Sequence, residues 1–559
     1  VQRGQPSVGV DQDFFELGGD SILAAVIVSR AALDGMYLKP QDIFLHTTVA
    51  SLSTVVRETP GLDVDQGPVQ GEAVLGPAAQ WFVERVDVDR SHFNQALLVP
   101  LGETPDASIM TEAIRVVMRH HDVLRSRFVA HGDEMRHVFA GDGGSDAVDF
   151  AIVPCIDSAG RHCERMWRDA IDAAQSSLDL EGGRLMAVRW LESTSVSSSR
   201  LLIVVHHMAI DGVSWSILLQ DLADCYLRLR ARTAAALPLK TSSVKAWVDQ
   251  WLALAQGDAL DDDRIYWRNV NARVRDVLGG PKRVALMRHG LTSIVQHAYQ
   301  ESSLSCAITL DADLTHAFRT TAPRAYGTDA NDLLVAALHA GFHAWSGSDA
   351  LLVDVEGHGR DALGDAIDLS RTVGWFTSIY PVLIDTPATA ADPSALIKSV
   401  KARLREVPRK GASYGVLRYL DATSQAGADA LTSFPRAPIL FTYLGQLEQL
   451  SGPSSPLYGG PPEPAPGIRS PRQRRTHLLD VVAYVSRGRL TVESSFFGVP
   501  GVDESIGCLM CRVEEALTML IRHCSADGVG GLTPDDVPQL DVDQDALDAL
   551  LEEIDALER

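Results

Sequence analysis

The chain has 559 residues, 46% hydrophobic and 22% charged, so it is long enough for two to four domains with substantial cores. Its 73 acidic residues outnumber the 50 basic ones, and a net charge of −23 disfavours a broad phosphate-binding surface and hence a nucleic-acid partner. No apolar run approaches the ~20 residues that a bilayer requires, and seven scattered cysteines suit reduced thiols, so we expect a cytoplasmic protein that does not bind membranes.

Residues 1–58 have the pattern of a small helical domain. An apolar helix is predicted at 20–35, after a glycine pair, and shorter helical segments at 40–44 and 47–58. Ser21 lies where the glycine pair gives way to the helix, so a phosphodiester on its hydroxyl would meet unpaired backbone N–H groups and the positive end of the helix dipole. From these residues alone, an ordinary N-cap is the stronger interpretation of Ser21.

The remaining chain alternates strands and helices. Residues 59–72 are rich in Pro, Gly and Asp and are predicted to be a linker. The alternation that follows predicts two α/β lobes, at 73–240 and 241–533. Strands are expected at 92–101, 201–208, 351–360 and 437–446, and a helix at 108–128.

Two later segments differ from this pattern. Residues 451–475 hold seven prolines and are predicted to be a loop. Residues 534–559 are acidic, and their leucines from 547 onwards recur at helical spacing.

Residues 204–215 read VVHHMAIDGVSW and place two histidines at the end of an apolar strand. Adjacent side chains of a strand point to opposite sides, so His206 and His207 cannot both bind one metal ion. A Ser or Cys triad is disfavoured because no nucleophile on a sharp strand-to-helix turn accompanies them. Proton transfer by one histidine remains, with Asp211 as an orienting or ion-paired residue before Gly212 opens a helix. For an isolated pair, a core role is the stronger interpretation.

Two other clusters are expected to be structural. His120, His121 and Asp122 are predicted to lie in the middle of a helix among arginines, where a solvated or interlobe role is expected. Cys508 and Cys511 lie in the apolar helical segment 506–521 and are predicted to be core positions rather than a metal or redox pair.

Several motifs together resemble known families. HHMAIDG, from His206 to Gly212, resembles the signature of the condensation-domain superfamily. The epimerization branch of this superfamily, in nonribosomal peptide synthetases, is resembled by VEGHGRD around Glu356, RTVGWFTSIYPV from Arg371, PRKGASYG from Pro408, LFTYLGQ around Tyr443 and PAAQWF near Gln80. FFELGGDS resembles the attachment motif of peptidyl carrier domains, and Asp20 is typical of carriers that feed an epimerization domain.

This resemblance implies a carrier–epimerization didomain of the α/β (α+β) class. Two chloramphenicol-acetyltransferase-like lobes would form a V-shaped pseudo-dimer, preceded by an all-α four-helix carrier whose first helix is missing from the chain. A phosphopantetheinyl transferase would attach 4′-phosphopantetheine to Ser21, and the enzyme would interconvert L and D configurations of an aminoacyl or peptidyl thioester. His207 and Glu356 are the implied acid–base pair, Tyr443 assists, and no metal is implied.

The reaction needs more than two proton-transfer groups, because negative charge develops on the carbonyl oxygen as the Cα proton leaves. The helix N-terminus after Gly212 and the Tyr443 hydroxyl are the candidate donors to that oxygen. Glu356 has a plainer interpretation, as an ion-paired surface residue with Arg360 as its partner. Thr442 stands where the family usually has asparagine, and its reach is shorter, so the rate or the substrate range can differ.

Two other functions stay open. One is peptide bond formation by a condensation domain, which the EGHGR-like stretch disfavours; the other is a catalytically degenerate domain that only binds carriers. The resemblance implies antibiotic or other secondary-metabolite biosynthesis, with adenylation and condensation domains of the same synthetase upstream. Residues 541–559 are predicted either to form part of an acidic docking segment for a downstream condensation domain or to be a linker helix.

Overall fold

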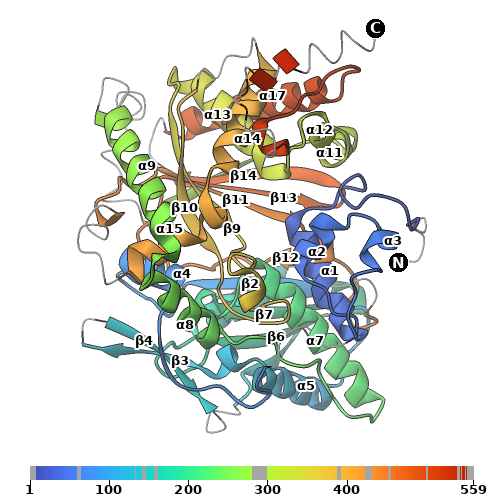
Figure 1. The fold of residues 1–559 in the computed structure, drawn as a ribbon. Helices are drawn as coiled ribbons and strands as arrows, with labels where there is room; N and C mark the ends of the chain where they lie inside the picture. The colour runs from blue at the N-terminus through green and yellow to red at the C-terminus, as the bar shows by residue number, and fades with distance from the viewer. Residues whose placement is uncertain are drawn as a thin grey trace.

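Two lobes of sheet and helix lie one above the other, and the N-terminal helices lie beside their junction (Figure 1). The computed structural model describes residues 8–58, 64–132, 134–141, 147–155, 161–279, 299–386, 392–421, 431–450, 455–498 and 502–537, with 542, 544, 546, 547, 549 and 550. In these ranges, no helix combines the length and the apolar character needed to cross a membrane.

The N-terminal lobe is built on a five-stranded sheet in the order β12-β2-β7-β6-β5. Its strands are β2 (Asn94–Pro100), β5 (Phe150–Pro154), β6 (Met186–Glu192), β7 (Arg200–His206) and β12 (Glu463–Pro464). Helices α5 (Ala107–His120) and α7 (Gly212–Arg230) pack with one face of β7, and α6 (Arg161–Ser176) with the other. The run LLIVV is apolar throughout because β7 is buried on both faces.

A smaller sheet in this lobe has the order β1-β4-β3. It consists of β1 (Gln70–Val74), β3 (Arg127–His131) and β4 (Glu134–Ala140), and α4 (Pro77–Arg85) follows β1. Residues 70–72 were predicted to belong to the linker but pair with β4, because the linker ends in an extended segment that meets a free strand edge.

The C-terminal lobe contains a six-stranded sheet in the order β10-β9-β11-β13-β14-β8. Its strands are β8 (Ser303–Thr309), β9 (Leu351–Gly357), β10 (Ser378–Ile384), β11 (Ile439–Gln446), β13 (Leu479–Ser486) and β14 (Arg489–Phe497). Only β11 pairs in parallel, with β9 and β13 on its two sides; the other described pairs of this sheet are antiparallel.

Helices cover this sheet on the side away from the other lobe (Figure 1). They are α11 (Ala312–Arg319), α12 (Thr321–Tyr326), α13 (Ala330–Ser346), α14 (Pro393–Arg405) and α17 (Val502–Cys524). Nearer the junction lie α8 (Val244–Ala255), α9 (Asp261–Gly279) and α15 (Ala412–Tyr419). Val353 and Val355 of β9 pack with α13 and α17, so the alternate residues Asp354 and Glu356 face the other lobe.

Residues 455–475 join the lobes; they form a loop as predicted except for the short strand β12. Glu463 and Pro464 pair with Leu98 and Leu97 of β2, and so add a strand from the C-terminal lobe to the sheet of the other. The prolines are tolerated because β12 lies at the sheet edge, where a missing N–H costs little.

Two helix predictions need correction. The predicted helix 108–128 ends at His120, and a short 3-10 turn then leads into β3 at Arg127. In the carrier segment, α1 (Ser21–Leu33) and α2 (Pro40–Leu45) form as expected, whereas α3 (Val49–Leu52) is a single turn.

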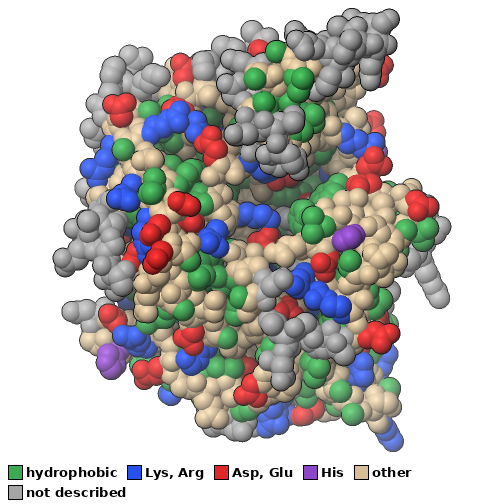
Figure 2. All heavy atoms as spheres, in the orientation of Figure 1, with side chains coloured by type: hydrophobic (Ala, Val, Ile, Leu, Met, Phe, Trp, Pro, Cys, Tyr) green, Lys and Arg blue, Asp and Glu red, His purple; other side chains and the backbone are tan. Residues whose placement is uncertain are grey.

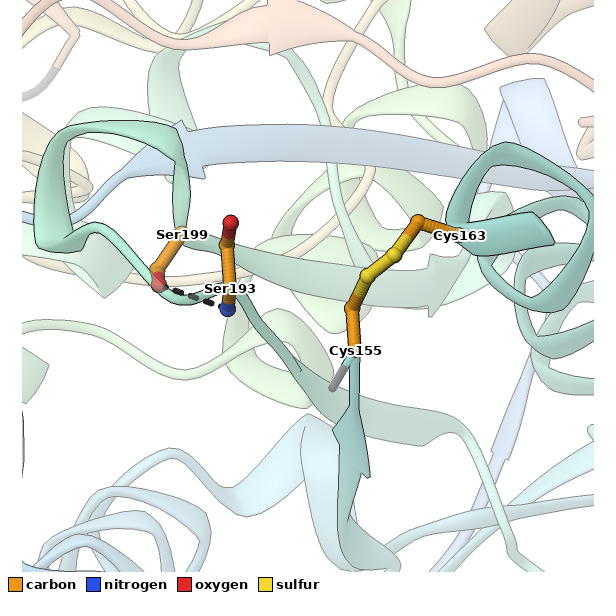
Figure 3. The surroundings of a disulfide bond; sticks show 4 residues. All are labelled: Cys155, Cys163, Ser193 and Ser199. Atoms are coloured by element: carbon orange, nitrogen blue, oxygen red, sulfur yellow. Dashed lines mark hydrogen bonds between the residues drawn. A yellow bond between two sulfur atoms is a disulfide. The ribbon is translucent and has the colours of Figure 1, made fainter. Parts of the chain in front are cut away.

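The cysteines also differ from prediction. Cys155 and Cys163 form a disulfide at the end of β5 and the start of α6, whereas all thiols were expected to be reduced (Figure 3). The Cα atoms of the two cysteines lie 5.4 Å apart, a separation that a disulfide can span. Cys508 and Cys511 are exposed on α17, so the prediction of two core positions is wrong.

Candidate active site

The two histidines of the HHMAIDG motif have different environments. His206, the last residue of β7, has no exposed surface; its Nε2 lies 2.7 Å from the Arg90 carbonyl oxygen, and its Nδ1 accepts the Met208 N–H. His207 begins the next turn and keeps part of its surface exposed, with its ring centroid 4.2 Å from that of Trp375. His207 is therefore the histidine that a substrate can reach.

The hydrogen bonds of His207 fix its tautomer. Its Nδ1–H donates to the Ile210 carbonyl oxygen at 2.9 Å, and its Nε2 lies 3.0 Å from the amide nitrogen of Gln95. The Trp215 indole N–H can only donate, and it donates to Gln95 Oε1 at 2.6 Å. Gln95 consequently donates to His207, and the lone pair lies on Nε2.

Burial, and then the charge of Arg469, lower the pKa of His207 to about 3, so the imidazole is neutral near pH 7. The sequence had not identified Gln95, Trp215, Trp375 or Arg469 as site residues. Gln95 carried the clearest signal, as a polar residue inside a predicted apolar strand.

Asp211 is a buried N-cap and a link between the lobes. Its carboxylate accepts the N–H and hydroxyl hydrogen bonds of Ser214 in the first turn of α7 and pairs with Arg360 at 2.8 Å. Arg360 also donates to the Leu369 and Thr372 carbonyl oxygens. Arg360 is thus buried in an ion pair with Asp211 and is not the partner of Glu356.

Glu356 ends β9 on the face toward the other lobe and is partly exposed. Thr442 of β11 donates its hydroxyl to Glu356 Oε2 at 2.9 Å. Burial raises the pKa of Glu356, and the Thr442 hydrogen bond and the charges of His477 and Arg469 oppose this rise without cancelling it. The raised pKa favours the protonated carboxyl more than in a free glutamate.

Tyr443 follows Thr442 on β11, so its side chain points to the opposite face of the strand. It lies beside Asp20, and burial followed by that carboxyl raises the pKa of Tyr443 well above its usual value. Asp20 caps α1 by accepting the Leu23 N–H at 2.7 Å, and burial raises its pKa. Ser21 is the first residue of α1, which places the start of that helix beside β11.

The carrier segment contacts both lobes. Arg371 donates to the Ser29 hydroxyl of α1 at 2.9 Å, and Arg30 donates to the Gln449 carbonyl oxygen at 2.6 Å. Helix α1 packs near α7 of one lobe and β11 of the other. Figure 2 shows this face hollowed between the upper lobe and the carrier segment, with acidic and basic side chains visible there.

One cluster has the composition of a metal site. Nitrogen or oxygen atoms of His120, His121 and Asp221 lie within 4.8 Å of one another. Asp221 is already ion-paired with Arg371 and lies 2.9 Å from His121 Nε2. Burial, His121 and the cations Lys240 and Arg371 lower the pKa of His120 to about 3 despite Asp221. These positive charges oppose cation binding. His121 is buried and the cluster links the lobes through Arg371, so of the two predicted roles the interlobe one fits His121 and the solvated one does not.

Comparison with known proteins shows which family has this fold. The sequence model of the condensation domain matches residues 69–530. The chain belongs to the condensation-domain family. A second model, of the phosphopantetheine attachment site, matches residues 2–56. The predicted α/β fold of the condensation and epimerization domains, preceded by a helical carrier segment, is therefore confirmed.

Solved structures agree with the family assignment. The epimerization domain from the third module of tyrocidine synthetase B aligns with a TM-score of 0.70 and 28% identity, over 83% of this chain and all of that one. The condensation domain of the Monacolin K polyketide synthase MokA shares the fold, with a TM-score of 0.57 and 14% identity over 83% of this chain and 99% of its own.

Curated relatives are much longer proteins. A linear gramicidin synthase of Brevibacillus parabrevis is 35% identical over 558 residues, which are 98% of this chain and 10% of that protein. Chondramide synthase cmdD of Chondromyces crocatus is 34% identical over 563 residues, 99% of this chain and 14% of its own length. This condensation-family chain thus spans about a tenth of the relatives it matches.

The carrier segment of this condensation-family chain fits the phosphopantetheine that its attachment site implies. The Asp20 carboxylate already accepts the Leu23 N–H at the start of helix α1, so the group that suits a phosphate there is a nearby cation. Arg319 donates to the Gly18 carbonyl oxygen at 3.4 Å, and its buried Nε has no partner among the described residues. A guanidinium with a free donor beside this helix start suits a phosphodiester.

Proposed function

We propose that this chain is the carrier–epimerization part of a nonribosomal peptide synthetase. It interconverts the L and D configurations at Cα of an aminoacyl or peptidyl group carried as a thioester on Ser21. One observation carries the proposal: His207 and Glu356 come from different lobes, both are partly exposed, and the charge of Arg469 acts on both. The 28% identity to an epimerization domain supports the same choice within the family.

The phosphopantetheine thioester would make the Cα proton more acidic than that of an ester or amide. His207 Nε2 accepts this proton once Gln95 releases the lone pair. Glu356, held toward its protonated form, gives its proton to the opposite face of Cα. One C–H bond breaks on one face of Cα and the new C–H bond forms on the opposite face, so the configuration inverts.

After one inversion, His207 is an imidazolium and Glu356 is a carboxylate, and burial disfavours both charged forms. Exchange with solvent restores neutral His207 and protonated Glu356. In the reverse reaction the Glu356 carboxylate removes the Cα proton and the His207 imidazolium returns one. Either configuration can therefore be the starting one.

Tyr443 is assigned to the carrier side of the site. Its position beside Asp20 suits a residue that orients the start of α1 when the substrate enters. His206, Asp211, Gly212 and Arg360 would maintain the turn that presents His207.

The alternatives make different predictions. A condensation domain would join two carrier-bound groups, and a degenerate domain would leave Cα untouched. Thr442 does not favour degeneracy, since it makes a hydrogen bond to Glu356.

The domain boundaries and partners belong to the same proposal. The carrier occupies 1–58, the linker 59–69, the lobes 70–240 and 241–533, and the acidic segment 534–559; the linker is shorter than the predicted 59–72 because 70–72 belong to β1. Adenylation and condensation domains upstream and a phosphopantetheinyl transferase are the expected partners. The docking prediction for 541–559 lies mostly outside the described residues. Leu547, which is described, is 1% exposed, and this supports the linker-helix alternative.

Exchange of the Cα proton tests the proposal. The carrier is loaded with an aminoacyl group labelled with deuterium at Cα, and loss of the label is followed by mass spectrometry. Epimerization predicts loss of the label together with the appearance of the D configuration. Retention of the label across a panel of aminoacyl groups, with peptide bond formation when an acceptor carrier is added, would identify a condensation domain instead.

A further inference from the structure

Arg469, at the junction of the lobes, forms no ion pair with any residue that the structure describes. Arg469 lies in the crossover segment 455–475, and its guanidinium carbon is 3.4 Å from the centroid of the Phe93 ring. Its Nη1 donates to the Asn94 carbonyl oxygen at 2.8 Å. Among the described residues, Nε and Nη2 have no hydrogen-bond partner and no carboxylate pairs with the guanidinium. Two donor directions are therefore free.

The backbone on both sides of Arg469 is fixed to the N-terminal lobe. Arg469 pairs with Phe93 in an antiparallel bridge. The Asn94 N–H donates to the Ile468 carbonyl oxygen at 2.8 Å, and the Ser470 N–H donates to the His92 carbonyl oxygen at 3.1 Å. These bonds on either side hold the guanidinium in place.

The same strand pairing brings Arg469 close to His207. The Phe93 carbonyl oxygen accepts the backbone N–H of His207 at 2.9 Å, and the rings of Phe93 and His207 are stacked with centroids 5.7 Å apart. The charge of Arg469 helps to lower the pKa of His207 and limits the rise in the pKa of Glu356, so it acts on residues of both lobes. Burial lowers the pKa of Arg469 itself to about 10, which still leaves it positive near pH 7.

The donors that the sequence offered for the substrate carbonyl oxygen are engaged elsewhere. Asp211 caps the first turn of α7, so a carboxylate already stands at that helix N-terminus. Tyr443 lies beside Asp20, on the face of β11 opposite Thr442. The developing negative charge needs another donor.

We propose that Arg469 is a catalytic residue that binds the carbonyl oxygen of the substrate thioester; this rests on the proposed function. When the Cα proton passes to its base, the C–H electron pair delocalises toward the carbonyl oxygen, and the free donors of Arg469 stabilise the charge there. Arg469 keeps all its protons, and the charge is removed when the second group protonates Cα.

The test compares Arg469→Gln with Arg472→Gln in the full chain. Arg472 is on the same segment and also reaches the N-terminal lobe, with Nε 2.7 Å from Asp89 Oδ2, but its side chain is 75% exposed. Deuterium loss from a loaded L-[2-²H]aminoacyl group is measured for both. We expect Arg469→Gln to be slower by about 10²- to 10³-fold, the usual cost of losing one such donor, and Arg472→Gln to be unchanged.

A second variant and a second measurement separate catalysis from folding. Arg469→Lys keeps the charge, but one ammonium cannot both bind the Asn94 carbonyl oxygen and replace the guanidinium fork, so an intermediate rate is expected. In the unloaded protein, NMR titration of ring-labelled histidine should show a higher pKa for His207 in Arg469→Gln and no change in Arg472→Gln. Thermal unfolding checks that each variant is folded.

The outcomes are distinct. No deuterium loss in the wild-type protein overturns the proposed function and this inference with it. Loss in the wild type, together with a normal rate in folded Arg469→Gln or Arg469→Lys, overturns only the role of Arg469. An unchanged pKa of His207 in Arg469→Gln also overturns it, because the charge would then not reach the site.

Discussion

Thr442 Oγ1 donates a hydrogen bond to Glu356 Oε2 at 2.9 Å across neighbouring parallel strands of the C-terminal sheet. This bond is one of the influences that keep the pKa of Glu356 from rising further. A residue that departs from the usual asparagine of the family therefore contacts the candidate acid directly.

Replacing Thr442 with valine removes the donor at similar volume. We expect the pKa of Glu356 to rise, so the limb of the pH–rate profile that Glu356 governs moves to higher pH. Thr442→Asn, which restores an amide donor, should keep or raise the exchange rate. Thr491→Val, on β14, is the matched control. A large loss in Thr442→Asn would show that threonine is adapted to the substrate of this enzyme.

His207→Ala and Glu356→Gln should each slow Cα exchange by about 10²- to 10⁴-fold, the contribution of one positioned acid or base. The exposed residues His131 and Glu301 offer matched controls, His131→Ala and Glu301→Gln. Deuterium loss from the loaded carrier is the measurement. A near-normal rate in Glu356→Gln would remove this residue from the mechanism.

Ser21→Ala should abolish attachment of phosphopantetheine and all exchange within the chain. The start of α1 remains capped by Asp20 in this variant, so folding should be unaffected. Intact-mass analysis after incubation with coenzyme A and a phosphopantetheinyl transferase decides the result. A mass increase in Ser21→Ala would place the attachment on another residue.

Arg371→Met should destabilise the protein and loosen the carrier. Asp221 is completely buried, and the loss of one partner of a buried pair costs about 3–5 kcal/mol. The same change removes the hydrogen bond to Ser29. Urea unfolding measures the loss, and Arg512→Met, which breaks a surface pair with Glu515, should change little. Equal unfolding free energies for the two variants would contradict the interlobe role.

Acid should destabilise the native protein from about pH 6.5 downward. Burial lowers the pKa of His137 and His206 to about 3, as it does mainly for His120 and His207. Between the unfolded pKa of about 6.5 and these values, the unfolded chain binds protons that the native state does not. Each group can then contribute up to about 1.4 kcal/mol per pH unit. In urea unfolding at several pH values, His137→Phe should reduce this slope, and an unchanged slope would contradict the assignment.

The strands that carry the site residues could be predicted from the sequence, whereas the residues that contact the site from distant parts of the chain could not. LLIVVHH and LLVDVEG are short apolar runs followed by polar motif residues, so β7, β9 and the exposed ends at His207 and Glu356 were visible in advance. Arg360 was misassigned because its pairing with Asp211 spans 149 residues. Arg469 was hidden in a proline-rich stretch, since only the tertiary pairing with Phe93 makes that stretch part of the site.

The helix ends show a similar limit. Residues 108–128 keep a helical apolar pattern beyond His120, but packing of His121 on Asp221 draws the chain out of the helix. The short α3 follows from its small and β-branched residues, which propagate a helix poorly without a packed face.

The strand exchange at β12 limits how this enzyme can be recombined. In a chimera that takes only residues 64–240 from this chain, the edge of β2 would have to pair with the donor's crossover strand, and a poor fit there would leave the edge open to pairing with other molecules. The chimera would also replace Arg469 by whatever the donor's crossover carries against Phe93. Grafts that exchange 455–475 together with the N-terminal lobe should therefore stay monodisperse and active, whereas cuts between the lobes alone should aggregate.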